Sequence, residues 1–292
     1  MQYRTGVGLI LLAGLLWSMQ GPIITLIDHT GSWALLMWRS IGLLAVLLAY
    51  LTLQGGALRQ MRGLGAAGVI GALGLVLAYG GAIFAFQSTS VAKTVLLFSA
   101  SPFFAAILGR IILGQRVRWI TWASILLATA GISWMVQDSL TGGSGIGDAA
   151  ALGSALGFAI FTVALGRGGA MFPTIALGAF FAIIAGCVMA LLMGQAIVTT
   201  GTDISLALFM GVVTLSGGMI LFSMGSRVVP AASATLMSLV EVFLAPVWMW
   251  LFFGQGISAN TAFGGAIVLT AVILNALSSG MSKTNLTLAG QS

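Results

Sequence analysis

Residues 92–116, AKTVLLFSASPFFAAILGRIILGQR, and residues 232–256, ASATLMSLVEVFLAPVWMWLFFGQG, are two versions of one pattern, 140 positions apart. Six of the 25 paired positions are identical, in the first copy Ala92, Leu96, Phe103, Ala105, Gly114 and Gln115. The same offset pairs Gly71 with Gly211. Because one offset relates several segments, the pattern indicates an internal duplication of the chain.

The composition decides the class of protein. Of the 292 residues, 59% are hydrophobic and only 5% are charged, whereas soluble proteins carry about 25% charged residues. The chain is therefore an integral membrane protein. Its net charge of +6 comes from scattered Lys and Arg, not from the clustered basic face that nucleic-acid binding needs. The one cysteine, Cys187, excludes an intramolecular disulfide and a cysteine-based metal cluster.

The apolar segments have the length of membrane-spanning helices, about 20 residues each. They are continuous, whereas the strands of a membrane barrel are about 10 residues long and alternate in hydrophobicity. We predict an all-α membrane protein with ten transmembrane helices, near residues 6–26, 33–53, 64–86, 91–113, 119–137, 148–166, 174–194, 204–226, 230–253 and 259–278. The short connections leave no room for a soluble domain.

The basic residues predict the orientation. Positively charged residues collect in the cytoplasmic segments of membrane proteins. With both termini inside, the inner segments hold Arg4, Arg59, Arg62, Arg110, Arg116, Arg118, Arg167, Arg227 and Lys283. The outer segments hold Asp28, Asp138 and Asp203, with Lys93 near an outer edge. The sequence thus predicts N-in and C-in.

The duplication then predicts an inverted repeat. Residues 1–140 form the first five-helix repeat, 141–280 the second, and 281–292 a short cytoplasmic tail, all within one membrane domain. Five is an odd number, so the second copy enters the membrane from the opposite side. Two such copies are related by a pseudo-two-fold axis in the membrane plane, which is typical of secondary transporters with a midplane site.

Several motifs resemble a known family. Ser101-Pro102 followed by Leu113-Gly114-Gln115, and Glu241-Val242 followed by Phe253-Gly254-Gln255, resemble the "P…lgE" signature of EamA-type carriers of the drug/metabolite transporter superfamily. So do Leu16-Trp17-Ser18, Arg39, Ser90-Val91-Ala92 and Pro230-Ala231-Ala232. The likeness covers residues 6–278 and looks nearest to the YddG-type exporters of aromatic amino acids. Gln stands for Glu in both copies, and Val242 stands where proline is expected.

The resemblance implies a cavity lined by spans one, three, four, six, eight and nine, with five and ten at the periphery. The candidate substrate-binding residues on those spans are Trp17, Gln20, Tyr79, Ser99, Phe158, Ser216, Ser238 and Glu241. Apolar walls with few polar groups suit an aromatic or aliphatic amphiphile.

The charged residues inside spans have two readings each. Glu241 is the only carboxylate deep in a span. In a functional role it contacts a substrate amine or carries a coupling proton, and in a structural role it makes a hydrogen bond to a neighbouring helix. For Arg39 we expect snorkelling to the interface or a pair with Asp28. His29, in the first outer loop, is not expected to be a ligand. Pro22, Pro102 and Pro246 are expected to kink their helices.

The function predicted is export of small amphipathic metabolites, most of all aromatic and other neutral amino acids, across a bacterial inner membrane. A permease for another substrate class and a channel-like facilitator remain alternatives. An enzyme is disfavoured, because there is no G-x-S-x-G motif and the one His lies in a loop. No Walker A motif, cofactor or metal site is expected. The partners are the small-molecule substrate and the lipid bilayer, and the protein is a monomer or a homodimer.

Overall fold

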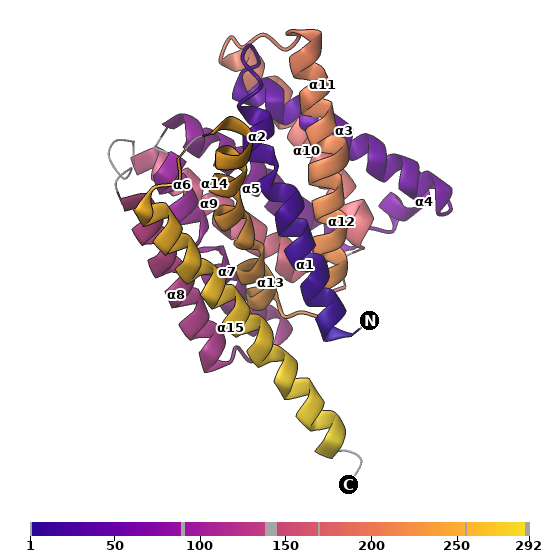
Figure 1. Cartoon of the computed structure of the whole chain (residues 1–292). Coiled ribbons are helices and arrows are strands. Elements are labelled where there is room, and N and C mark those ends of the chain that lie inside the picture. The colour runs from indigo at the N-terminus through magenta and orange to yellow at the C-terminus, as the bar shows by residue number, and fades with distance from the viewer. Residues whose placement is uncertain (1, 89–90, 138–144, 169, 255, 290–292) are drawn as a thin grey trace.

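The computed structural model describes residues 2–88, 91–137, 145–168, 170–254 and 256–289. Within these ranges all regular structure is helical, as predicted. The helices stand side by side in a bundle, and both termini lie toward its lower end in Figure 1.

The elements follow the duplication along the chain. The first half contains α1 (Tyr3–Ser18), α2 (Gln20–Ile24), α3 (Ser32–Leu53), α4 (Ala57–Arg62), α5 (Ala66–Ser88), α6 (Val91–Phe98), α7 (Ser101–Leu113) and α8 (Trp119–Val136). The second half contains α9 (Gly145–Gly166), α10 (Met171–Leu192), α11 (Gly201–Phe209), the π-helix η2 (Met210–Leu215), α12 (Ser216–Gly225), α13 (Ala231–Ser238), α14 (Val240–Phe253) and α15 (Ala259–Ala289).

The backbone repeats with the sequence. α7 ends at Gly114 with φ of 64°, and α14 ends at Gly254, 140 positions later, with φ of 65°. Both glycines hold the left-handed conformation that commonly closes a helix and that glycine adopts without a steric penalty. The two copies therefore share helix ends as well as side chains.

Helix contacts close a ring. Neighbours around it are α1, then η2 and α12, α3, α10, α5, α9, α7 and α13, which packs against α1 again. Exchange of the two repeats maps this order onto itself, as an inverted repeat requires. α8 and α15 pair with each other outside the ring, at one edge of the molecule (Figure 1). The fifth and tenth predicted spans are thus peripheral.

Three predicted spans are broken rather than continuous. The first is interrupted at Met19, the fourth at Ser99–Ala100 and the ninth at Leu239. At each break a backbone N–H bonds to the carbonyl three residues earlier. At the ninth-span break, for example, Leu239 N–H donates to the Leu236 carbonyl at 3.2 Å. The fourth and ninth breaks are 140 positions apart, so the repeat carries them too.

Proline accounts for only two of the breaks. Pro22 and Pro102 each follow a break by a few residues and remove a backbone donor there. Pro246 lies inside α14, seven residues beyond the break at Leu239. The break at Leu239 therefore occurs without a proline, and the kink expected at Pro246 stays a prediction.

The eighth span contains a π-helix that the sequence did not reveal. Met210–Leu215 adopt this wider turn, and the Ser216 hydroxyl donates to the Gly211 carbonyl at 2.6 Å. Glycines let η2 touch α3 at the backbone: a Cβ on Gly42 would lie 3.2 Å from the Gly211 Cα, and one on Gly211 would overlap the Arg39 carbonyl oxygen. π-bulges are frequent at functional sites.

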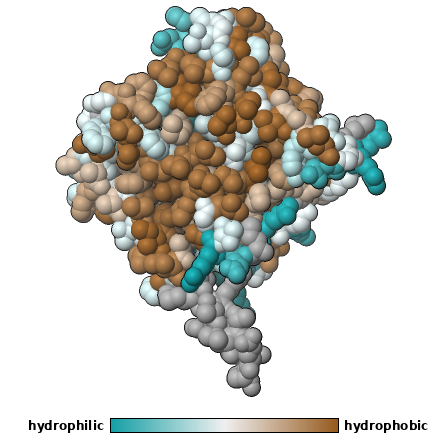
Figure 2. Space-filling view, turned by 45° about the vertical axis from the view of Figure 1, so that its right-hand side comes forward, coloured by the Kyte–Doolittle hydropathy of each residue, from teal (hydrophilic) through white to brown (hydrophobic). Residues whose placement is uncertain are grey.

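The surface is that of a membrane protein. Nine of the described helices or broken helices are long and apolar enough to cross a membrane, and a tenth apolar stretch, Trp119–Met135, is shorter. Figure 2 shows hydrophobic residues across the middle of one face and hydrophilic residues toward its ends. Large apolar side chains such as Ile111, which is 73% exposed, indicate contact with lipid tails.

Candidate functional site

Aromatic side chains fill the centre of the ring. Trp17 of α1 meets Phe158 of α9 edge to face, with ring centroids 5.9 Å apart. Phe222 of α12 lies 5.4 Å from Trp17 and 5.2 Å from Phe158, and Phe98 of α6 lies 5.9 Å from Phe158. We call these four residues the aromatic cluster. It joins four spans, and two of its members, Trp17 and Phe158, are predicted site residues.

The aromatic cluster is asymmetric although the backbone is repeated. The repeat mate of Trp17 is Gly157. A Cβ on Gly157 would lie 2.5 Å from the Gly74 carbonyl oxygen, so α9 touches α5 at the backbone. On the other side of the ring, the Trp17 indole packs against Gly218 of α12, where a Cβ would overlap it. The contact of α1 with α12 therefore holds an indole, whereas the equivalent contact of α9 with α5 in the repeat is made by the backbone.

A polar group lies beside the aromatic cluster. The Arg39 guanidinium of α3 lies 5.4 Å from the centroid of the Tyr79 ring of α5, in cation–π geometry. Arg39 Nη1 also donates to Gln20 Oε1 of α2 at 3.4 Å. Tyr79 belongs to the same buried core as Trp17 and Phe158. Gln20 and Tyr79 are therefore brought together by a residue that was not among the predicted site residues.

The expectation for Arg39 was wrong. Its side chain neither snorkels to the interface nor pairs with Asp28, but turns inward onto Tyr79. Its Nε and the Tyr79 hydroxyl are both buried without a hydrogen-bond partner. Buried polar groups in proteins are normally satisfied, so two unsatisfied groups at one place require an explanation. The signals in the sequence were the arginine's place within an apolar span and its part in the resemblance to EamA-type carriers.

The three predicted serines bond to their own helices. Ser99 donates to the Leu96 carbonyl at 2.5 Å, and Ser238 donates to the Thr235 carbonyl at 2.8 Å. Ser216 belongs to the π-turn described above. All three are buried, and a hydroxyl that donates still has lone pairs to accept a hydrogen bond. None contacts the aromatic cluster through a bond that the structure records.

Glu241 is the second residue of α14, just after the break at Leu239, and is half-buried. Among the contacts of the described residues, its carboxylate has no hydrogen-bond partner. The break packs closely on α1, since a Cβ on Gly14 would overlap the Val240 side chain. Two turns further along α14, Trp248 Nε1 donates to the Ser18 hydroxyl at 2.8 Å. Glu241 therefore lies beside the first span, on a segment held to it.

At one end of the ring, the loop after α2 and the start of α3 bind the loop after α10 and the first turn of α11. Asp203 Oδ2 accepts the His29 backbone N–H at 2.9 Å and the Thr30 hydroxyl at 3.1 Å. Trp38 Nε1 donates to the Ile197 carbonyl at 2.8 Å. His29 takes part through its backbone alone, and these bonds join the first repeat to the second.

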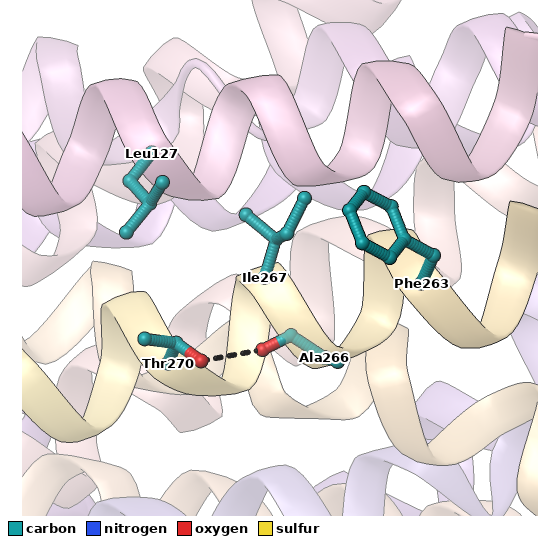
Figure 3. Close-up of a pocket in the computed structure, with 5 residues that line it drawn as sticks. All are labelled: Leu127, Phe263, Ala266, Ile267 and Thr270. Atoms are coloured by element: carbon teal, nitrogen blue, oxygen red, sulfur yellow. Dashed lines mark hydrogen bonds between the residues drawn. The ribbon is translucent and has the colours of Figure 1, made fainter.

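A shallow pocket lies away from these residues. Leu127 of α8 and Phe263, Ala266, Ile267 and Thr270 of α15 line it (Figure 3). Thr270 bonds to the Ala266 carbonyl of its own helix, as the dashed line marks. Because α8 and α15 lie outside the ring and Phe263 is 56% exposed, this groove faces lipid. Over the described part of the chain no three His, Cys, Asp or Glu residues gather to hold a metal ion.

Comparison with known proteins agrees with the repeat. The model of the EamA-like transporter family matches residues 4–137 and again residues 145–277. The Pseudopaline exporter CntI of Pseudomonas aeruginosa is 26% identical over 278 residues, covering 92% of this chain and 95% of that protein. The Uncharacterized transporter YwfM of Bacillus subtilis is 25% identical over 205 residues, covering 68% and 69%.

The fold recurs in a solved structure. A crystal structure with 17% sequence identity superposes with a TM-score of 0.81 and covers 93% of this chain and 97% of that one. At this identity the likeness concerns the fold alone.

Proposed function

The chain belongs to the EamA-like transporter family, and we propose that it is a secondary transporter that exports small amphipathic metabolites by alternating access. Ten spans cross the membrane, with α8 as the shortest, and both termini lie in the cytoplasm of a bacterial cell. The ring of helices is built from two inverted copies, so the same contacts can open toward either side.

The observation that carries the proposal is the aromatic cluster at the ring's centre, flanked by the breaks at Ser99–Ala100 and Leu239. Broken helices expose backbone groups where a substrate can bind in the membrane's interior. Aromatic walls favour a flat apolar substrate, because each ring pair adds about 0.5–1.5 kcal/mol beyond burial.

For the substrate we propose aromatic and other neutral amino acids, bound by Trp17, Gln20, Tyr79, Ser99, Phe158, Ser216, Ser238 and Glu241. The aromatic cluster supports an aromatic side chain, and Glu241 is placed to meet an amine. The Pseudopaline exporter among the relatives supports a second candidate, a larger amphipathic metabolite of another class. A channel-like facilitator is the remaining alternative, with less support from the filled centre of the ring.

Counterflow in proteoliposomes tests the proposal. Vesicles preloaded with unlabelled phenylalanine should accumulate labelled phenylalanine faster than empty vesicles, with saturable kinetics. A channel would show neither trans-stimulation nor saturation. Lysine and glutamate should compete poorly, because their charges would be desolvated with few partners. If phenylalanine fails but other apolar metabolites exchange, the transport proposal stands and the amino-acid assignment falls.

A further inference from the structure

We propose that Arg39, Tyr79 and Gln20 form a binding site for the carboxylate of the transported molecule. The inference rests on the proposed transport function and adds the chemistry of one end of the substrate. Three spans contribute, since Arg39 is on α3, Tyr79 on α5 and Gln20 on α2. Repeat exchange would place Ala179, Met219 and Ile160 at these positions, so the site exists once per molecule.

The first argument is an unpaired positive charge. Arg39 meets Gln20 at 3.4 Å and the Tyr79 ring at 5.4 Å, and the described contacts give it no carboxylate. The carboxylate of Asp203 is engaged by His29 and Thr30 at the end of the ring. A guanidinium held inside a membrane protein is expensive unless it is paired. An anionic ligand supplies the missing partner.

The second argument is the set of free donors. Arg39 Nε is buried without an acceptor, and so is the hydroxyl of the Tyr79 ring that the guanidinium covers. The Gln20 amide turns its oxygen to Arg39, which leaves its NH₂ group as a further donor. A carboxylate has only acceptors, about four lone-pair sites, and matches the planar fork of arginine. By contrast, the free Trp17 Nε1 faces Gly218 and belongs to another wall.

The third argument is the rigid mounting of Arg39. Its own carbonyl lies against Gly211 of η2, so the backbone at Arg39 is held by the π-turn of the eighth span. Precise placement of this kind is what a binding residue needs. The site carries a single positive charge. One carboxylate neutralises this charge, whereas a phosphate dianion would leave a net negative charge. Tyr79 belongs to the same buried core as Trp17 and Phe158 of the aromatic cluster.

Binding to the purified protein in nanodiscs tests this without transport. The probes are two matched pairs, 3-phenylpropionate with phenethylamine and octanoate with octylamine, each measured by the shift in melting temperature. The wild type should bind both carboxylates. Arg39→Gln should weaken carboxylate binding at least tenfold and leave the amines unchanged. Arg39→Lys should restore part of the loss, because it returns the charge without the fork.

Two further variants keep the result interpretable. Tyr79→Phe removes only the free hydroxyl and should weaken binding of the carboxylates several-fold. This variant tests the site if Arg39→Gln does not fold. Arg116→Gln makes the same change at an exposed arginine and should leave all four probes unchanged. Equal carboxylate binding by wild type, Arg39→Gln and Tyr79→Phe would overturn the inference, as would no carboxylate binding by wild type. Arg39-dependent binding of octanoate without amino-acid transport would retain the subsite and remove the amino-acid assignment.

Discussion

Trp17 of the first repeat meets Phe158 of the second edge to face, with ring centroids 5.9 Å apart. Their repeat mates are Gly157 and Ser18, which are small. Two inverted copies thus supply nearly equivalent backbone positions, and aromatic side chains occupy one of each pair. In the proposed transport cycle the backbone symmetry would serve alternating access, and the side-chain asymmetry would give the candidate site one apolar wall and one polar wall.

The aromatic wall predicts selective loss. Trp17→Ala removes ring contacts with Phe158 and Phe222, each worth about 0.5–1.5 kcal/mol for an aromatic partner, so we expect transport of phenylalanine to fall two- to tenfold more than that of alanine. Initial rates in proteoliposomes check this. Trp250→Ala, at a half-exposed position on α14, is the control and should change neither rate. Equal losses for both substrates would assign Trp17 to folding.

Two adjacent glycines of α5 predict opposite effects on stability. A Cβ on Gly81 would lie 2.8 Å from the Ala150 carbonyl oxygen of α9, whereas one on Gly80 would meet nothing within 4 Å. Gly81→Ala should therefore destabilise the protein by about 1–3 kcal/mol. Gly80→Ala should leave stability unchanged or raise it, since alanine favours helix. Melting in detergent measures both, and equal melting temperatures would contradict the close packing of α5 on α9.

Much of the architecture was predictable because it depends on average properties. The composition indicates that the chain lies in a lipid bilayer. The offset of 140 residues found in the sequence also relates the two helix breaks at Ser99–Ala100 and Leu239. The break at Leu239 itself was not predictable, since no proline or glycine marks it. The π-helix at Met210–Leu215 was not predictable for a different reason: it depends on backbone contact with α3 at Gly211, which is a tertiary effect.

The site was predicted in part. Trp17 and Phe158 do meet, and Gln20 and Tyr79 lie on the same polar group. Arg39 was missed because its position along α3 fits a snorkelling side chain equally well. Only the packing of α3 beside α5 turns the guanidinium inward, and no local pattern encodes that choice.

Topology can be tested at the two ends of α3. Trp33 N–H donates to Gln195 Oε1, so Ala196 lies near the start of α3, while Gln54 caps its end. A helix of 22 residues is about 33 Å long, enough to cross the hydrocarbon core. In a Cys187→Ala background, we expect an impermeant maleimide to label Ala196→Cys in intact cells and Gln54→Cys only after lysis. The reverse pattern would place the termini outside. The topology predicts a further outer loop near residues 138–147, of which 138–144 lie outside the described residues.

Variants of Glu241 test whether its carboxylate couples transport to protons. Its carboxylate has no hydrogen-bond partner among the described residues. Glu241 lies in the first turn of α14, at a break that packs on α1, so a change in its charge would act on two spans at once. If Glu241 carries the coupling proton, Glu241→Gln should abolish uptake driven by a pH gradient while substrate counterflow continues, because counterflow needs no net proton movement. If Glu241 binds the substrate's amine, both activities should fall. Glu241→Asp should retain part of the driven uptake, since it keeps a titratable group.

The repeat supplies the control for this measurement. Ser101 is the mate of Glu241 and cannot titrate, so Ser101→Ala should leave driven uptake and counterflow in their wild-type ratio. Loss of both activities in Glu241→Gln, with protein still folded, would mean that the carboxylate holds the substrate's amine instead of a proton. Wild-type rates in both assays would exclude both roles, and the free carboxylate would then have no part in transport.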